Sequence, residues 1–426
     1  MTIATTTSSP TNRSGLDPSG PMWSCTCMSG FTARIRRTRP AATFAMAARA
    51  RALRAAGHDV ISLSIGEPDL PTPDHVIAAA HAAACAGETR YPPIAGTEAC
   101  RAAVARKFTR DLNRPVAPNQ VLITNGGKQA IFNAVMALIE PGDTVLIPAP
   151  CWAGYIQVVE FAGGTPVFLP CSASSGFRLD PARLEAAITP ASRLLLLNYP
   201  NNPSGAVAHP AMLQAIAGVL RRHPHVHVIA DDIYEHLIFE GAYHTIAGIA
   251  PDLADRIVTL SGVSKSYAMT GWRLGFCTGP ADWLAAMGLV QGTATAGVST
   301  ISQAAAVAAL DGPQDLLVER RAIYRHRRDL VLAGLAAAPH LTCTRPDGAF
   351  YAFPSIAGLL GRTSPAGRRL ATDDDVADAL LDEALVATVP GSAFAMPGHI
   401  RLSTAASDDA LTRACARIAQ FCGAVK

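Results

Sequence analysis

Residues 193–205 read RLLLLNYPNNPSG, a run of leucines that ends in asparagines and prolines. A continuous apolar run of this length is typical of a strand buried on both faces of a sheet. The asparagines and prolines after it predict a rigid turn that presents an amide side chain. Four similar runs are TVLIPAP (144–150), TPVFLP (165–170), HVHVIADD (225–232) and RIVTLSG (256–262). Together these runs predict a mostly parallel sheet.

Helical patterns separate most of the predicted strands. Segment 125–143 opens with two glycines, stops at a Pro-Gly pair, and has one apolar helical face, formed by Ile131, Val135, Leu138 and Ile139. Thr72 is expected to cap another helix, with Pro73 in its first position. Alternation of strands and helices predicts βαβ units and therefore an α/β fold.

The sequence pattern changes after about residue 312. A charged helix at 314–330 leads to GAFYAF at 348–353, and a terminal helix capped by Ser407 closes the chain. We expect four parts: a flexible N-terminal extension at 1–38, an arm that joins a small domain at 39–74, a large domain at 75–311, and a small α+β domain at 312–426.

Composition excludes several classes of protein. The 426 residues carry a net charge of +3, but residues 1–54 hold +7 and the remainder −4, so the body lacks the basic face of a nucleic-acid binder. Residues 1–40 are also too short and too rich in Thr, Ser and Pro for a helix-turn-helix. The absence of an 18-residue apolar run argues against a membrane span.

Ten cysteines are scattered along the chain rather than concentrated as in a disulfide scaffold. Cys85, Cys415 and Cys422 lie in apolar helical patterns, which predicts that they are small buried hydrophobic residues. This use of cysteine favours a reducing compartment, and we expect a cytoplasmic protein. No metal site is expected.

Four segments, most of them at predicted strand ends, carry candidate chemistry, because α/β folds bind ligands at the carboxyl ends of their strands. They are TNGGKQ (124–129), NYPNNPSG (198–205), ADDIY (230–234) and SGVSKSYAMTGWRLGF (261–276). Taken singly, the first two also read as turns, and Asp231 also reads as a helix cap. Lys265 lies among Ser, Met, Trp and Gly, not on a charged face. A desolvated amine of this kind suits Schiff-base chemistry.

Asn202, Asp231, Lys265 and Arg273 follow one another with gaps of 29, 34 and 8 residues. With GEPDLPTP (66–73), VPGSAFAMPG (389–398) and HIRLS (399–403), they resemble the fold-type I pyridoxal-phosphate (PLP) enzymes over most of 40–420, specifically the class I and II aminotransferases. The resemblance is greatest to the bacterial aspartate/prephenate branch. It implies a large domain with a mostly parallel, seven-stranded type of sheet flanked by helices, plus a smaller α+β domain.

The resemblance also implies roles around the ring of the cofactor. Lys265 would bind PLP as a Schiff base and then act as the general base between Cα and C4′. Asp231 would pair with the pyridine nitrogen, and Asn202 and Tyr234 would hydrogen-bond the ring oxygen O3′. Trp152 would stack on the ring, although a core aromatic is the alternative.

The phosphate would be bound by Arg273, by the backbone of Gly126, Gly127 and Lys128, and by Ser261 or Ser264, between which the sequence does not choose. Tyr91 would reach the phosphate of a partner subunit, which implies a homodimer.

The substrate residues are likewise implied by the resemblance. Arg401 would bind the α-carboxylate in a bidentate pair, with a strand carrying one exposed arginine as the alternative. Asn202 and Trp152 would also contact the substrate, and Gly66 would let the carboxylate approach the backbone closely. Lys128, with Arg39 and Thr43 from the arm, would favour dicarboxylic substrates.

Three positions depart from the aspartate/prephenate branch: Ala41 where Ser is frequent, Thr404 where Tyr is common, and Cys151 where Tyr usually precedes the stacking Trp. Transfer of an amino group from an L-amino acid to a 2-oxo acid, of the aspartate/2-oxoglutarate or prephenate type, is the activity that we expect. Another amino acid, or elimination, decarboxylation or oxidation at the same cofactor, remains the alternative.

Overall fold

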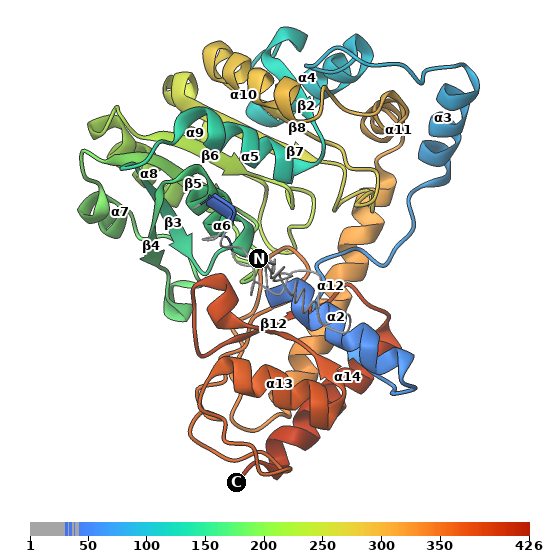
Figure 1. The fold of residues 1–426 in the computed structure, drawn as a ribbon, viewed down its shortest axis with the longest axis vertical. Helices are drawn as coiled ribbons and strands as arrows, with labels where there is room; N and C mark the ends of the chain where they lie inside the picture. The colour runs from blue at the N-terminus through green and yellow to red at the C-terminus, as the bar shows by residue number, and fades with distance from the viewer. Residues whose placement is uncertain (1–29, 33, 36–37, 39–41) are drawn as a thin grey trace, which may run out of the picture.

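The computed structural model describes residues 30–32, 34–35, 38 and 42–426. The expected extension at 1–38 lies mostly outside these residues, as do Arg39 and Ala41. Figure 1 shows a central sheet covered by helices in the upper part of the view and a second layer of short strands and helices below it, with α12 (Asp315–Ala336) running between the two.

The central sheet has seven strands in the order β2-β8-β7-β6-β5-β3-β4. Strand β8 is antiparallel to both of its neighbours, and the other pairs are parallel. This confirms the predicted fold class. The strands are β2 (Val121–Thr124), β3 (Thr144–Ala149), β4 (Thr165–Pro170), β5 (Ser192–Asn198), β6 (His227–Asp231), β7 (Ile257–Gly262) and β8 (Gly275–Thr278).

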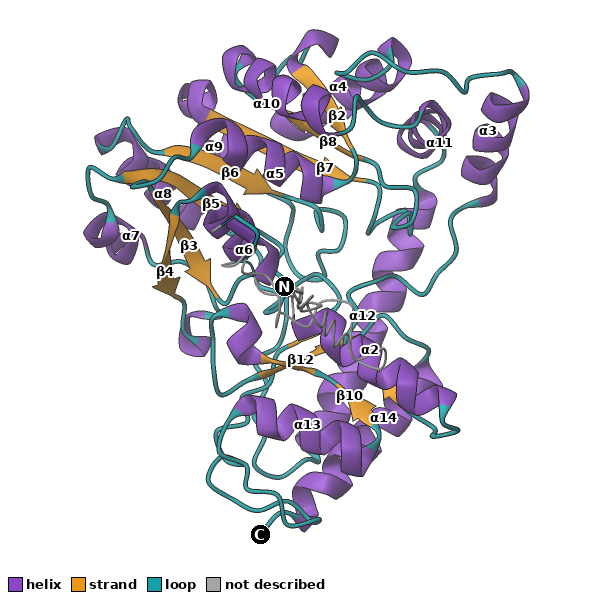
Figure 2. Ribbon diagram, in the orientation of Figure 1, coloured by secondary structure: helices purple, strands orange, loops and turns teal. Residues whose placement is uncertain are grey.

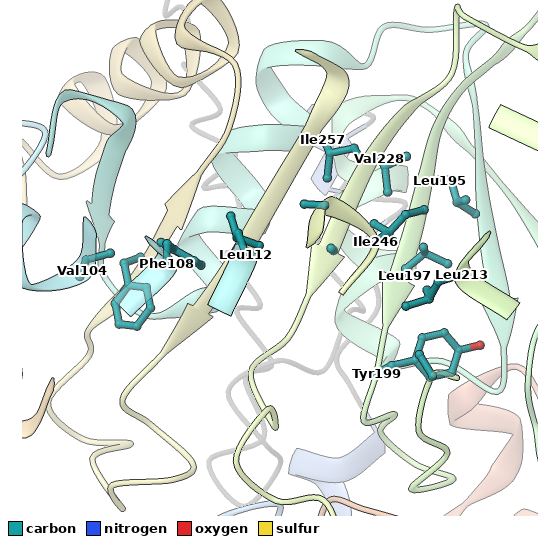
Figure 3. Packing of buried hydrophobic residues seen from close by; sticks show 14 of the residues in the cluster. Val104, Phe108, Leu112, Leu195, Leu197, Tyr199, Leu213, Val228, Ile246 and Ile257 are labelled. Carbon is teal, nitrogen blue, oxygen red and sulfur yellow. The ribbon is translucent and has the colours of Figure 1, made fainter. Parts of the chain in front are cut away.

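Helices cover both faces of this sheet because successive residues of each strand point to opposite sides. In β5, Leu195 and Leu197 pack with Val228, Leu213 and Ile246 on one face (Figure 3), whereas Leu194 and Leu196 pack on the other. The helices are α3 (Asp74–Cys85), α4 (Glu98–Leu112), α5 (Gly127–Leu138), α6 (Ala153–Ala162), α7 (Pro181–Ala187), α8 (Pro210–Arg222), α9 (Ile246–Ile249), α10 (Ala281–Ala294) and α11 (Thr300–Asp311).

The second layer is built from segments near both ends of the described chain. Strand β1 (Ile61–Ser62) pairs in parallel with β10 (Val386–Ala387), and β12 (Ile400–Ser403) lies between β11 (Val389–Pro390) and β9 (Tyr351–Ala352). The helices α2 (Ala42–Ala55), α13 (Asp373–Ala384) and α14 (Asp408–Ala424) pack around these strands (Figure 2). The domain boundaries at 38, 74 and 311 stay predictions.

Several local expectations can be compared with the structure. Ser407 caps α14 by accepting a hydrogen bond from the backbone N–H of Ala410. Thr72 does not cap α3, because its hydroxyl donates to the Ala268 carbonyl (2.9 Å) and accepts from the Trp272 indole (3.0 Å). The apolar run TPVFLP forms β4, but β4 is an edge strand, so it is largely exposed rather than buried on both faces.

The cysteine prediction is correct for Cys415 and Cys422, which are buried, and wrong for Cys85, which is exposed near the end of α3. An alanine-rich helix such as α3 gives little contrast between its buried and exposed faces, so position 85 could not be assigned from its pattern. Among the described residues, no helix has the length and apolar character needed to cross a membrane.

Candidate active site

A cavity of about 360 Å³ lies at the carboxyl ends of the central strands, where it is also lined by residues of β9 and β12. Most of the predicted site residues line it. They are Gly66, Gly127, Lys128, Trp152, Asn202, Asp231, Tyr234, Ser264, Lys265, Arg273 and Arg401. The structure therefore brings together residues that are spread over more than 330 positions of the sequence.

Lys265 lies on the loop between β7 and β8, just beyond the end of β7. Its Nζ donates a hydrogen bond to the Gly66 carbonyl at 2.7 Å. Burial lowers the pKa of the Lys265 amine to about 8; Glu67 opposes this shift, whereas the charges of Arg401 and Arg273 add to it. A pKa of this size leaves a substantial fraction of the amine neutral, and so nucleophilic, near neutral pH.

Asp231 is the last residue of β6 and is 5% exposed. Tyr155 donates to its Oδ2 at 2.6 Å, and the Ile233 N–H donates to Oδ1 at 3.2 Å. Burial raises the pKa of Asp231 to about 6, against the effect of these two hydrogen bonds. A carboxylate that faces a cavity under these conditions favours a cationic partner there.

Arg401, in β12, is 2% exposed and reaches Asn202 across the cavity wall. Its Nη1 donates to Asn202 Oδ1 at 3.0 Å, and its Nη2 donates to the Ser64 carbonyl at 2.6 Å. The guanidinium carbon lies 4.7 Å from the Tyr351 ring centroid and 4.8 Å from that of Phe394. Nε is buried and has no hydrogen-bond partner among the described residues, so the group retains capacity for an anion.

Arg273 lies next to the N-terminus of α5. Its Nη1 donates to the Thr270 carbonyl (2.9 Å) and its Nη2 to the Asn125 carbonyl (3.3 Å). Gly126 has φ +81°, and a Cβ there would lie 2.7 Å from Arg273 Nη2. A guanidinium beside the free N–H groups of a twelve-residue helix forms an anion site.

The remaining predicted residues differ in position. Trp152, at the start of α6, lies 5.6 Å from Lys128 Nζ, measured to the ring centroid. Of the two serines, Ser264 lines the cavity, whereas Ser261 lies outside it and donates to Glu235 Oε1 at 2.7 Å. Tyr91 lies outside the cavity and is 93% exposed. Arg39 lies outside the described residues.

Three further residues support the site and were not identified from the sequence. Tyr155 holds Asp231, and Asn198 Nδ2 donates to the Asp231 carbonyl at 2.9 Å. Tyr351 lines the cavity and shares a 2.6 Å hydrogen bond with the Tyr234 hydroxyl. Both tyrosines lie in apolar segments that read as core, and the need of a buried phenol hydroxyl for a polar partner is the signal that could have identified them.

The geometry agrees with the comparison of this chain with known proteins. The sequence model of the family "Aminotransferase class I and II" matches residues 58–418. The chain belongs to this family. The aminotransferase is 45% identical to the aspartate/prephenate aminotransferase of Cereibacter sphaeroides, an alignment that covers 93% of this chain and 99% of the relative.

Solved structures show the same relationship. The crystal structure of the aspartate aminotransferase from Rhizobium meliloti matches with a TM-score of 0.90 and 45% identity, covering 93% of this chain and 99% of the other. The aspartate aminotransferase from Thermus thermophilus with maleate matches with a TM-score of 0.86 and 39% identity, covering 92% and 100%.

The aminotransferase uses PLP to move an amino group from an amino acid to a 2-oxo acid. The residues of the cavity fit this cofactor. An amine, a carboxylate and a guanidinium line one cavity, and glycines at 126 and 275 leave the N-terminus of α5 accessible. A Cβ at Gly275 would overlap the backbone of Gly126 and Gly127, which explains the glycine of the RLG motif.

The depressed pKa of Lys265 predicts its reactivity in the cofactor-free protein. Because only the neutral amine attacks an aldehyde, labelling of Lys265 should rise with pH around a midpoint near 8, below the ordinary lysine value of 10.5. The measurement is brief exposure to PLP at each pH, borohydride trapping and peptide quantification, with exposed Lys426 as the internal comparison. A midpoint near 10.5 would contradict the expectation.

The contact between Gly66 and Tyr351 gives a second prediction. A Cβ at residue 66 would overlap the Tyr351 hydroxyl, and overpacking of this kind destabilises a fold by about 1–3 kcal/mol. Gly66→Ala should therefore lower the melting temperature by a few degrees. Tyr351→Phe removes the oxygen and leaves Cζ at 3.1 Å, so the double variant should recover part of the loss. Strictly additive melting temperatures would show that the two positions do not clash.

Proposed function

We propose that the aminotransferase binds PLP through Lys265, Asp231 and Arg273 and acts on dicarboxylic substrates. The observation that carries this proposal is that the Lys265 amine, the Asp231 carboxylate and the Arg273 guanidinium line the same cavity. Bound PLP supplies an aldehyde that condenses with an amino group and a ring that withdraws electrons from it.

Each group of this chain has a role that follows from its surroundings. Lys265 takes the proton from the substrate Cα, because its lowered pKa of about 8 places it close to the working pH. Asp231, fixed by Tyr155, holds a proton at the ring nitrogen as an ion pair. Asn202 and Tyr234, which line the cavity, would hydrogen-bond the ring oxygen, and the Trp152 indole would cover the ring and exclude water.

The phosphate end would be bound by Arg273, by the backbone of 126–128 and by Ser264. Ser261 is not proposed, because it lies outside the cavity and already donates to Glu235. At the opposite end, Arg401 binds the substrate α-carboxylate. Its Nη1 contact with Asn202 limits the orientations of the guanidinium, which favours a bidentate pair with the carboxylate.

Two cationic side chains of the cavity, Lys128 and Arg401, are not used by the proposed cofactor contacts, and together they favour a substrate with two carboxylates. Lys128 lines the same cavity as Arg401 with an exposed side chain, and desolvation by its neighbours and the charge of Arg273 lower its pKa. The Cereibacter relative is named for aspartate and prephenate, and the Thermus structure contains maleate. Phe44, Ile65 and Thr43 line the cavity as well, and the first two supply an apolar wall suited to the ring of prephenate. Arg39, which lies outside the described residues, is proposed for the substrate site from the family resemblance alone.

A homodimer is also proposed, with Tyr91 reaching the phosphate of the partner. Tyr91 is 93% exposed, Leu289 on α10 is 75% exposed, and Ile94 is 46% exposed beside Gly292 of α10. These residues support an apolar surface that a second copy would cover. The burial of most described thiols is consistent with the cytoplasmic location expected from the sequence.

Asp231→Asn tests the site and the reaction together. Loss of the buried anion should lower amino transfer from aspartate to 2-oxoglutarate by at least about 100-fold, the usual scale for a proton-holding group. The control is Asp232→Asn, because Asp232 lies outside the cavity and accepts a hydrogen bond from Tyr243. Amino transfer by this variant should fall by less than about 10-fold when compared at equal folded fraction. Ammonia, carbon dioxide or peroxide instead of paired amino-acid and oxo-acid products would favour the alternative reactions.

Lys128→Ala tests the dicarboxylate proposal. Loss of one charge-assisted hydrogen bond should lower kcat/KM for aspartate about 10- to 100-fold and change it much less for a neutral donor such as alanine. Lys128→Arg, which keeps the cation, should restore part of the preference. Equal losses for acidic and neutral donors would remove Lys128 from substrate recognition.

A further inference from the structure

Tyr351 is a buried active-site tyrosine for which the proposed roles above have no use. It is 1% exposed and lines the cavity between Gly66 and Arg401. Its backbone is fixed from two sides. In β9 it pairs with Ser403 of β12, two residues from Arg401, while the Ala349 N–H donates to the Leu237 carbonyl, three residues from Tyr234, at 2.8 Å.

The Tyr351 hydroxyl makes a short hydrogen bond to the Tyr234 hydroxyl, 2.6 Å between the oxygens. Both residues are almost fully buried, so water does not compete for this hydrogen bond. Gly66 keeps the space open, since a Cβ there would overlap the Tyr351 oxygen. Any side chain larger than glycine at position 66 would therefore displace the Tyr351 hydroxyl, which is consistent with a required position for this hydroxyl.

The Tyr351 ring makes a second contact with the site. Its centroid lies 4.7 Å from the guanidinium carbon of Arg401, which is itself 2% exposed. A buried cation over an aromatic face is stabilised by the ring quadrupole, and the ring also limits the orientations that the guanidinium can adopt. One side chain thus contacts both a proposed cofactor ligand and the proposed carboxylate ligand.

We propose that Tyr351 is a positioning residue that acts through Tyr234 and Arg401. Its hydroxyl donates to Tyr234, so that Tyr234 directs its own proton into the cavity toward the ring oxygen of the cofactor, and its ring holds Arg401 ready for the α-carboxylate. The inference rests on the proposed roles of Tyr234 and Arg401.

The direction of the hydrogen bond follows from the inventory of donors. A phenol has one proton to donate and lone pairs to accept. If Tyr234 donates to an anionic ring oxygen, the 2.6 Å contact requires that Tyr351 be the donor to Tyr234. Hydrogen bonds in such a chain strengthen one another by roughly 10–30%.

A double-mutant cycle on the holoenzyme tests the hydroxyl. A donor to the ring oxygen stabilises its negative charge and weakens its hold on the neighbouring proton, so loss of the donor raises the pH midpoint of the visible absorbance change. Tyr234→Phe should raise it by about 1 unit, since a hydrogen bond to a charged group has that size, and Tyr351→Phe by roughly 0.1–0.3 unit. In the Tyr234→Phe background, Tyr351→Phe should add nothing.

An equal shift by Tyr351→Phe in both backgrounds, or no shift in either, would overturn the proposal. Tyr324→Phe is the matched control, because Tyr324 is another buried tyrosine that packs on Phe350 and lies outside the cavity. The pH midpoint of the absorbance change should not move in this variant. Absence of a lysine-bound chromophore in the unmodified enzyme would instead contradict the proposed role of Lys265.

The ring is tested by binding of succinate, a dicarboxylate without an amino group, measured by calorimetry. Tyr351→Phe keeps the ring and should bind succinate within about 3-fold of the parent, whereas Tyr351→Leu should bind it about 5- to 30-fold more weakly. Melting temperatures and far-ultraviolet spectra establish that both variants are folded. Equal succinate affinity of the Phe and Leu variants would remove the ring from the positioning of Arg401.

Discussion

The site depends on the register between two neighbouring parallel strands. Asn198 at the end of β5 pairs with Asp231 at the end of β6, and the Asn198 side chain closes the pair by donating to the Asp231 carbonyl at 2.9 Å. The same Asn198 accepts from the backbone N–H of Asn202 at 3.0 Å. Because side chains alternate along a strand, a shift of one residue would turn Asp231 away from the cavity and separate it from Asn202.

Burial has opposite effects on the two titrating groups at this edge. It lowers the pKa of Lys265 to about 8 and raises that of Asp231 to about 6, so each moves toward its neutral form. The protein alone therefore does not fully compensate either charge. A ligand that is cationic at one end and anionic at the other would stabilise the charged forms of both groups. The proposed binding of the cofactor ring nitrogen at Asp231 agrees with this imbalance.

The sequence predicted the strand-end residues because parallel strands place their carboxyl ends at one edge of a sheet, whatever their separation along the chain. Asn202, Asp231 and Lys265 follow this rule, whereas Arg273 precedes the antiparallel strand β8, whose amino end lies at the same edge. Tyr155 and Tyr351 do not follow it, since Tyr155 lies within α6 and Tyr351 in β9 of the second layer, and each belongs to an apolar segment. Ser261 and Ser264 could not be separated because the end of β7 was uncertain by a few residues; Ser261 lies within the strand and Ser264 beyond it.

The loop between β7 and β8 carries Lys265 near its start and Arg273 near its end, and it is held at both sides by antiparallel strands that continue into the sheet. Two neighbouring groups of one small molecule, its aldehyde and its phosphate, would therefore be bound by residues of a single loop. The residues proposed to bind substrate, by contrast, belong to α2, α5 and β12. Changes in α2, α5 and β12 would therefore alter the substrate contacts and leave the proposed cofactor contacts in place, whereas an insertion or deletion between 265 and 273 would displace Lys265 relative to Arg273.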